Sequence, residues 1–279
     1  MAKDKIAFVG GGQMAESMIR AVLGKHLVPP SRIIATGPRR ERRAELAKEF
    51  GITAVASNAD AATQSDVVVL SVKPQVLPTV MKELRGKLSA DQLVISIVAG
   101  ASMRVLESGL GHKTIVRAMP NTPAQVGMGV TAWYPSHAVT AEQREHTKSI
   151  VAALGEELMV EDESYIDMAT ALSATGPTYV FLLMEALVDA GVHLGFSRRV
   201  AEELVLRTVE GSALFARRSG RHLAELRNMV TSPGGTSAAA IYQLEKGSLR
   251  TVLSKAVYAA YQRAVELGAN AERKVGLDE

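Results

Sequence analysis

The hydrophobic pattern of the chain changes near residue 160. Before that point, short apolar runs rich in β-branched residues alternate with stretches of helical period, and after it only the helical period continues. Alternating strands and helices predict a parallel sheet covered by helices, whereas an uninterrupted helical pattern predicts an all-α domain. We therefore expect a doubly wound, mostly parallel α/β domain over residues 1–162 and a helical domain over 163–279.

Seven apolar runs in the first half read as strands of a sheet with seven or eight strands. Asp66–Val72 and Gln92–Val98 are continuous apolar runs, as expected for strands that are buried on both faces. Helices are expected at Glu16–Leu23 and Arg39–Phe50, and Asn58 is a suitable cap for a further short helix. The other expected strands are Ile6–Val9, Arg32–Thr36, Thr53–Ala56, Thr114–Met119 and Gly129–Trp133.

Glycines punctuate the helical pattern of the second half. Because glycine commonly ends a helix, we expect Gly195, Gly220, Gly247 and Gly268 to mark helix ends. The expected helices are Ser164–Leu172, Gly176–Leu194, Arg198–Ser219, His222–Val230, Thr236–Gly247 and Leu249–Leu267.

The longest apolar stretch, residues 180–196, carries Glu185, Asp189 and His193 as one polar stripe along a helix. A membrane span needs about 20 apolar residues, so the stripe argues against one. The rest of this helix is apolar all round, which exceeds what packing on one neighbour requires. We therefore expect a helix buried against a second subunit, in at least a homodimer of a soluble, cytoplasmic protein.

The composition excludes several classes of chemistry. The chain of 279 residues contains no Cys, so disulfides, thiolate metal sites and cysteine nucleophiles are absent, and the six His show no ligand spacing; no metal site is predicted. The net charge of +3 is small, although the sequence pI is about 9.1. Aromatic residues make up only 4%, too few for base-stacking platforms, so nucleic acid is not an expected partner.

The stretch IAFVGGGQMA places three glycines between the first strand and a helix. This order is typical of a dinucleotide-binding βαβ unit. Gly10 allows the tight turn, Gly12 lets the backbone approach a pyrophosphate, and the N–H groups of the first helical turn, at Gln13 and Met14, face the phosphates. A glycine-rich loop that only turns the chain is the alternative.

The end of the second strand carries the signal for the coenzyme. NAD-binding units usually place a carboxylate there, whereas this chain reads Thr36-Gly37-Pro38-Arg39-Arg40. A hydroxyl and guanidinium groups suit a 2′-phosphate, so NADPH is preferred and NADH is the alternative. We interpret Arg42 and Arg43 as a solvated helix face.

Four further motifs, SVKPQ (71–75), AMPNTPA (118–124), ATGPTY (174–179) and VTSPGGTS (230–237), follow the glycine loop in order. With GGGQMA they resemble the pyrroline-5-carboxylate reductase family over nearly the whole chain. The resemblance implies an N-terminal Rossmann domain, a C-terminal helical domain that builds a dimer, and in many members a decamer. It also implies reduction of a cyclic imine to L-proline with NADPH or NADH, the last step of proline biosynthesis.

Strand ends supply the remaining candidates for the coenzyme site. Cofactors lie at the carboxyl ends of parallel strands, where the backbone before a proline can wrap a ribose. The resemblance places the loop from Ser71 to Pro74 on the coenzyme and favours a role near the nicotinamide for Asn121. Lys73 could instead be a plain cation at a strand end, and Asn58 could instead be a helix cap. These candidates are Ser71, Val72, Lys73, Pro74, Ala99, Gly100, Asn121 and Asn58.

VTSPGGTS is the candidate substrate site. Its proline and glycines make a sharp turn that opens a helix with free N–H donors and two hydroxyls, which suits a carboxylate. By similarity, Gly234, Gly235, Thr236 and Ser237 bind the substrate, although a plain helix cap is the alternative. Many members of the family read GSGPAY where this chain has ATGPTY. Thr175, Gly176 and Pro177 stay substrate candidates there. Ala174 adds a methyl group and Thr178 adds bulk, so we expect a different local shape of the pocket.

We hypothesise that the protonated imine takes a hydride at its ring carbon, so that binding and orientation supply most of the rate. Ser237 or a water is the candidate proton donor. The rivals are a reductase of another small imine or hydroxy acid on the same scaffold and a non-enzymatic NADP-binding regulator. Hydroxy-acid enzymes usually carry a Lys in the first long helix of the second domain, and residues 180–194 contain none.

Overall fold

The computed structural model describes residues 4–275, which form two compact units. Among the described residues, the first unit joins 4–175 to 259–275, and the second is Gly176–Tyr258. The sequence pattern alone divides the chain after residue 162. In the structure, the next thirteen residues and the C-terminal segment belong to the same unit as the sheet.

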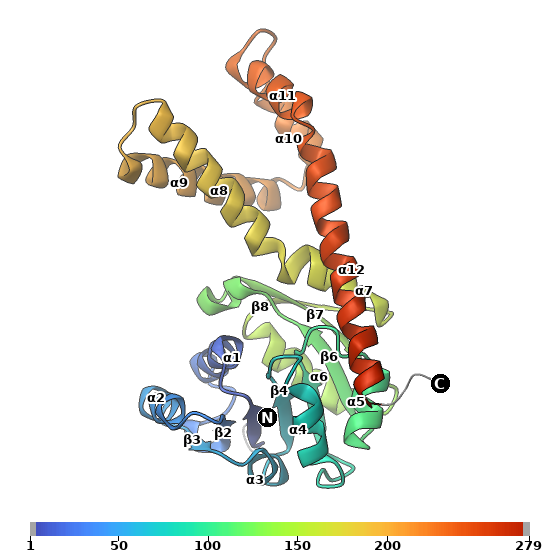
Figure 1. Cartoon of the computed structure of the whole chain (residues 1–279). Helices are drawn as coiled ribbons and strands as arrows, with labels where there is room; N and C mark the ends of the chain where they lie inside the picture. The colour runs from blue at the N-terminus through green and yellow to red at the C-terminus, as the bar shows by residue number, and fades with distance from the viewer. Residues whose placement is uncertain (1–3, 276–279) are drawn as a thin grey trace. The chain divides into compact units, whose positions relative to one another are not determined.

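An eight-stranded sheet in the order β3-β2-β1-β4-β5-β6-β7-β8 forms the centre of the first unit (Figure 1). All neighbours pair in parallel except β6 and β7, which are antiparallel. The expected doubly wound, mostly parallel α/β domain is therefore confirmed. The strands are β1 (Ile6–Val9), β2 (Ile33–Thr36), β3 (Thr53–Val55), β4 (Val67–Leu70), β5 (Leu93–Ser96), β6 (Ile115–Met119), β7 (Gly129–Pro135) and β8 (Gly155–Met159).

Helices cover both faces of this sheet (Figure 1). Phe8 of β1 packs with α1, α2 and α6 on one face, and Val9 packs with α3, α4 and α5 on the other, because successive side chains of a strand alternate. The helices of this unit are α1 (Gln13–Gly24), α2 (Arg40–Phe50), α3 (Asn58–Thr63), α4 (Leu77–Leu84), α5 (Met103–Leu110), α6 (Ala141–Ala152) and α7 (Ser164–Ala169). Short 3₁₀ turns occupy Pro30–Arg32 and Thr122–Val126.

The short helix α3 corrects one expectation. Its N-cap is Ser57, whose hydroxyl accepts a hydrogen bond from the Asp60 N–H, and Asn58 is the first helical residue. The prediction that Asn58 caps this helix is therefore wrong. The Ser57 hydroxyl, one residue earlier, is the cap, so the Asn58 side-chain amide is available for other contacts.

The second unit is helical, as expected. It contains α8 (Gly176–His193), α9 (Arg198–Ser219), α10 (Leu223–Met229), α11 (Thr236–Lys246) and the first part of α12 (Leu249–Val275). The helices α8 and α9 approach closely, since a Cβ on Gly191 would lie 3.0 Å from Ala201 Cβ. Within residues 176–258 the buried apolar side chains are Val188 and Ala201.

The long helix α12 continues to Val275 and passes through Gly268, so the expected end at this glycine is wrong. The reason is packing, because a Cβ on Gly268 would lie 3.1 Å from the carbonyl oxygen of Gly100. Gly100 has a φ of +72°, and a Cβ there would lie 2.6 Å from Leu267 Cβ. In addition, the hydroxyl of Ser102 donates to Glu272 at 3.1 Å. The glycine therefore permits a close approach between α12 and the loop after β5.

One continuous helical stretch, Ser164–His193, is long and apolar enough to cross a membrane by length and composition. It joins α7 and α8 through a π-helical turn at Thr170–Ala174. Only 11% of its most apolar window is buried, with Phe181, Leu182 and Leu183 exposed in this chain. An exposed apolar surface of this kind needs either a partner or a lipid phase.

Candidate functional site

The glycine loop after β1 has the geometry of a phosphate cradle. Gly10 has a φ of +106°, and a Cβ there would lie 2.7 Å from the carbonyl oxygen of Ser71. A Cβ on Gly12 would meet nothing within 4 Å. The Ser71 hydroxyl donates to the Gly10 carbonyl at 2.8 Å and holds the loop in place. Gly10 is therefore required by the turn, whereas the space beside Gly12 is open to a ligand.

The N-terminus of α1 opens directly onto this space. The first hydrogen bond of the α1 ladder runs from the Glu16 N–H to the Gly12 carbonyl at 3.0 Å. The N–H groups at Gln13 and Met14 precede that bond, so they belong to the set that an α-helix leaves without partners in its own ladder. Gly12 and Gln13 are exposed. The arrangement fits a pyrophosphate, which helix N-termini bind through such groups.

A chain of hydrogen bonds connects the glycine loop to α4. The buried hydroxyl of Thr36 accepts from the Gly10 N–H at 3.1 Å and donates to Asn58 Oδ1 at 2.5 Å. Asn58 Nδ2 then donates to Glu83 Oε2 at 2.7 Å. The proton of the Thr36 hydroxyl is thus used inside the protein, which makes Thr36 a brace of the loop.

The structure differs from the expectation as to which arginines at the start of α2 are solvated. Arg42 donates from Nε to the Gly11 carbonyl at 2.9 Å and forms an ion pair with Glu16. Arg43 donates from Nη1 to the carbonyls of Gly37 and Pro38, at 2.7 and 3.0 Å. The interpretation of Arg42 and Arg43 as a solvated face is therefore wrong, because both side chains fold back onto the loops.

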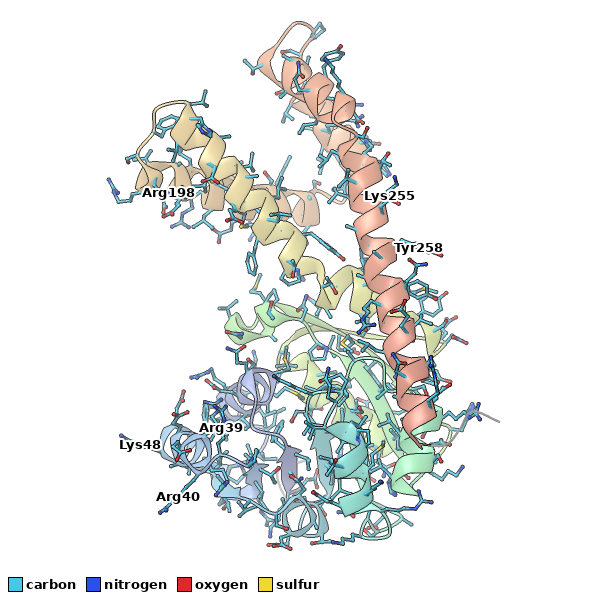
Figure 2. All side chains as sticks on the ribbon, viewed as in Figure 1. Arg39, Arg40, Lys48, Arg198, Lys255 and Tyr258 are labelled. Atoms are coloured by element: carbon cyan, nitrogen blue, oxygen red, sulfur yellow. The ribbon has the colours of Figure 1, made fainter. Side chains whose placement is uncertain are left out.

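The side chains of Arg39 and Arg40 are exposed and make no hydrogen bond within residues 4–275. Figure 2 shows Arg40 and Lys48 pointing away from the sheet. Arg39 stands at the N-cap of α2 and Arg40 begins the helix. Both guanidinium groups are thus available to a phosphate near the end of β2.

The Arg42 guanidinium lowers the pKa of Glu16 below its ordinary value through a direct hydrogen bond. A carboxylate with a depressed pKa stabilises the fold above its unfolded-state pKa, and this contribution is lost as the pH falls through the folded pKa. We expect Glu16→Gln to lower the melting temperature at pH 7 and to flatten its decline between about pH 5 and pH 3. Scanning calorimetry measures both, with the exposed Glu41→Gln as control. An unchanged acid profile would contradict the role of this pair.

A pocket of about 470 Å³ extends from the glycine loop toward α3 and α4. Its wall includes Gly10 and Val72 at the strand ends and Thr36, Gly37 and Pro38 at the end of β2. Parallel α/β sheets bind their ligands at the carboxyl ends of the strands. The pocket therefore has the position expected for the adenosine half of a dinucleotide.

The loops after β4 and β5 lie at the same edge of the sheet. Ser71 binds the backbone of β1, whereas the side chain of Lys73 is exposed and makes no hydrogen bond in the described part of the chain. The Lys73 carbonyl accepts from the Val76 N–H at 2.9 Å, so the segment through Pro74 forms a turn. After β5, Ala99 is half-buried and the adjacent Gly100 packs against α12.

Asn121 is held from two sides beyond the end of β6. Its Oδ1 accepts from the Val130 N–H at 2.9 Å, and its Nδ2 donates to the hydroxyl of Ser173 at 3.3 Å. Ser173 lies in the π-helical turn that ends just before Thr175, and the Thr175 hydroxyl donates back to the Thr170 carbonyl at 2.9 Å. Such turns are frequent at functional sites. Sequence reasoning missed Ser173, because its partner is 52 residues away.

The segment VTSPGGTS forms a turn and a helix start within the second unit. Gly234 has a φ of +69°, and the Gly235 N–H donates to the Ser232 carbonyl at 3.1 Å. Gly235 caps α11 without a side-chain hydrogen bond. Thr236 is exposed and Ser237 is half-buried at the first turn of the helix. The donors and hydroxyls predicted for a carboxylate are thus at one helix N-terminus.

Taken together, the doubly wound sheet and the open glycine loop define the class as a protein with a dinucleotide-binding domain. Two family models match the chain. Residues 163–267 match "Pyrroline-5-carboxylate reductase dimerisation", and residues 5–100 match "NADP oxidoreductase coenzyme F420-dependent".

Curated relatives match nearly the full length. The pyrroline-5-carboxylate reductase of Pseudomonas aeruginosa is 44% identical over 96% of this chain and 98% of its own length. The enzyme of the same name from Arabidopsis thaliana is 38% identical over 94% and 95%. This chain belongs to the pyrroline-5-carboxylate reductase family.

Solved structures agree with this assignment. The pyrroline-5-carboxylate reductase of Coxiella burnetii has a TM-score of 0.86 and 39% identity, covering 95% of this chain and 98% of that one. The Plasmodium falciparum pyrroline carboxylate reductase, solved with NADP bound, has a TM-score of 0.89 and 31% identity, covering 96% and 99%. The dimerisation model includes α8, so the exposed apolar surface of this helix belongs to a homodimer domain.

Proposed function

We propose that this protein reduces 1-pyrroline-5-carboxylate to L-proline with NADPH, the last step of proline biosynthesis. The observation that carries the proposal is the 44% identity to a curated reductase over 96% of the chain. The fit of the coenzyme rests on the open space beside Gly12, into which a Cβ would project without meeting an atom within 4 Å. NADPH, when bound, supplies the hydride.

The residues of this chain bind, orient and protonate. For the coenzyme we propose the pyrophosphate at Gly10, Gly12, Gln13 and Met14, and the 2′-phosphate at Arg39 and Arg40. The substrate carboxylate binds the N–H groups at the start of α11, around Gly235 and Thr236, which holds the imine carbon in a fixed orientation. The remaining proposed contacts are Thr36, Asn58, Ser71, Val72, Lys73, Pro74, Ala99, Gly100 and Asn121 for the coenzyme and Thr175, Gly176, Pro177 and Gly234 for the substrate.

The assay that tests the function follows NADPH absorbance after addition of pyrroline-5-carboxylate. We expect absorbance loss with NADPH, slower loss with NADH, and no coenzyme reduction with a 3-hydroxy acid in the reverse direction. Coenzyme binding without turnover of the imine would favour a non-enzymatic regulator. Turnover of the hydroxy acid would favour the other class of reductase on this scaffold.

Ser237 is the proposed proton donor to the ring nitrogen, directly or through a water. We expect Ser237→Ala to lower kcat by about a hundredfold, because a positioned acid contributes on that order. Ser237→Thr keeps the hydroxyl and should retain most of the activity. Steady-state kinetics of both variants test the assignment. Full activity and full substrate affinity of Ser237→Ala would remove it.

We further propose that the homodimers formed through the helical domain assemble into a decamer and that the enzyme is cytoplasmic. The resemblance to the family supports the decamer. Light scattering of the purified chain measures the assembly, with a mass near ten chains as the expected result.

A further inference from the structure

The coenzyme pocket is lined by an acidic side chain, although the end of the strand β2 supplies none. Of the residues that line the pocket of about 470 Å³, Glu83 and Lys87 carry charges. Glu83 lies in α4, far in sequence from the end of β2. The strand end itself supplies Thr36, Gly37 and Pro38 to the same wall and no carboxylate. The pocket thus receives its one negative charge from a helix.

The position of this carboxylate is set by the hydrogen bonds of Asn58. Because Asn58 Oδ1 accepts from the Thr36 hydroxyl, the Asn58 amide must turn its Nδ2 the other way. That nitrogen donates to Glu83 Oε2 at 2.7 Å. The Glu83 carboxylate is therefore held two hydrogen bonds away from the Thr36 hydroxyl, which itself holds the glycine loop.

A carboxylate in this region discriminates between the two nicotinamide coenzymes. In dinucleotide-binding units an acid near the end of the second strand accepts a hydrogen bond from the ribose 2′-OH, and a 2′-phosphate in the same place is repelled. The exposed guanidinium groups of Arg39 and Arg40 act in the opposite sense, since they attract the phosphate. Selectivity then depends on the balance between these charges.

We propose that Glu83 is a specificity-determining residue, which supplies from α4 the acid that β2 lacks. Its carboxylate weakens the NADPH preference set by the arginines and keeps NADH usable. The inference rests on the proposed function. It concerns the selectivity of the coenzyme site, which direct binding measures without the imine.

The test compares Glu83→Gln with the parent chain. Gln keeps the size and an oxygen acceptor for Asn58 but removes the charge. Isothermal titration should show about fivefold tighter NADPH binding and NADH binding that is equal or weaker, a size expected for one charge at a solvated site. The gain for NADPH should shrink in 0.5 M salt, because screening acts on exposed charges. The kcat/KM ratio for NADPH over NADH should rise by a similar factor.

Glu145→Gln on α6 is the control, because it makes the same change in net charge at an exposed position. We expect parental selectivity from this variant. A ratio of NADPH to NADH affinity in Glu83→Gln within twofold of the parent chain would overturn the inference. Failure of the parent chain to reduce pyrroline-5-carboxylate would instead contradict the proposed function, and the binding ratio would still decide the role of Glu83.

Discussion

Gly12→Ala is expected to leave the protein folded and to weaken NADPH binding by about a hundredfold, equal to about 2.7 kcal/mol. The backbone at Gly12 has φ −75° and ψ −179°, which alanine adopts freely, and an added Cβ meets no atom within 4 Å. That methyl group would instead occupy the space before the N-terminus of α1, where the pyrophosphate is proposed to lie. The melting temperature and the NADPH dissociation constant measure the two effects separately.

Gly10→Ala is the matched comparison, two residues earlier in the same loop. Its φ of +106° is unfavourable for alanine, and the new Cβ would lie 2.7 Å from the Ser71 carbonyl oxygen. We expect a loss of stability of about 3 kcal/mol or more. If Gly12→Ala melted as low as Gly10→Ala, or bound NADPH like the parent chain, the distinction between a turn glycine and a ligand glycine would be wrong.

Arg117→Ala is expected to destabilise the first unit by about 3 kcal/mol. Arg117 on β6 is 3% exposed and forms ion pairs with Glu163 and with Asp167 of α7, the latter at 3.0 Å. Glu163 also accepts from the Met103 N–H at 2.6 Å. Removal of the guanidinium leaves two partly buried carboxylates without their shared cation, and this is the main part of the cost.

The midpoint of urea unfolding measures this effect. Arg144→Ala on α6 is the control, because Arg144 is exposed and its side chain makes no hydrogen bond or ion pair within residues 4–275. We expect the control to stay within about 0.5 kcal/mol of the parent chain. An equal, small effect of both substitutions would show that the buried cluster does not hold α7 on the sheet.

The hydrophobic pattern predicts most of the helices and strands, because their positions depend on residues that are neighbours in the sequence. The expected β1 (Ile6–Val9) and α9 (Arg198–Ser219) match the structure to the residue. The strand β8 (Gly155–Met159, GEELM) was not individually predicted, since this half-exposed edge strand carries two glutamates and no β-branched residue. The end of α12 was misplaced because Gly268 serves a contact with Gly100, which no local pattern contains.

The candidate site shows the same division. The sequence indicates that cations gather after β2, but it does not indicate which of them turn inward. Arg42 folds back because the Gly11 carbonyl and Glu16 are across from it, 31 and 26 residues away in the chain. Glu83 and Ser173 were missed for a similar reason, since each acts on an asparagine that only the fold brings near. Glycine motifs predict that a ligand binds. The residues that orient the ligand's contacts cannot be identified without the tertiary structure.

The stoichiometry of the reaction tests the central claim most directly. The purified chain is mixed with pyrroline-5-carboxylate and a limiting amount of NADPH, and L-proline is quantified by chiral chromatography when absorbance is constant. One L-proline per NADPH oxidised is expected, with an initial rate about a hundredfold lower for the Gly12→Ala variant at the same limiting coenzyme concentration. NADPH oxidation without L-proline, or no oxidation by the folded parent chain, would contradict the account.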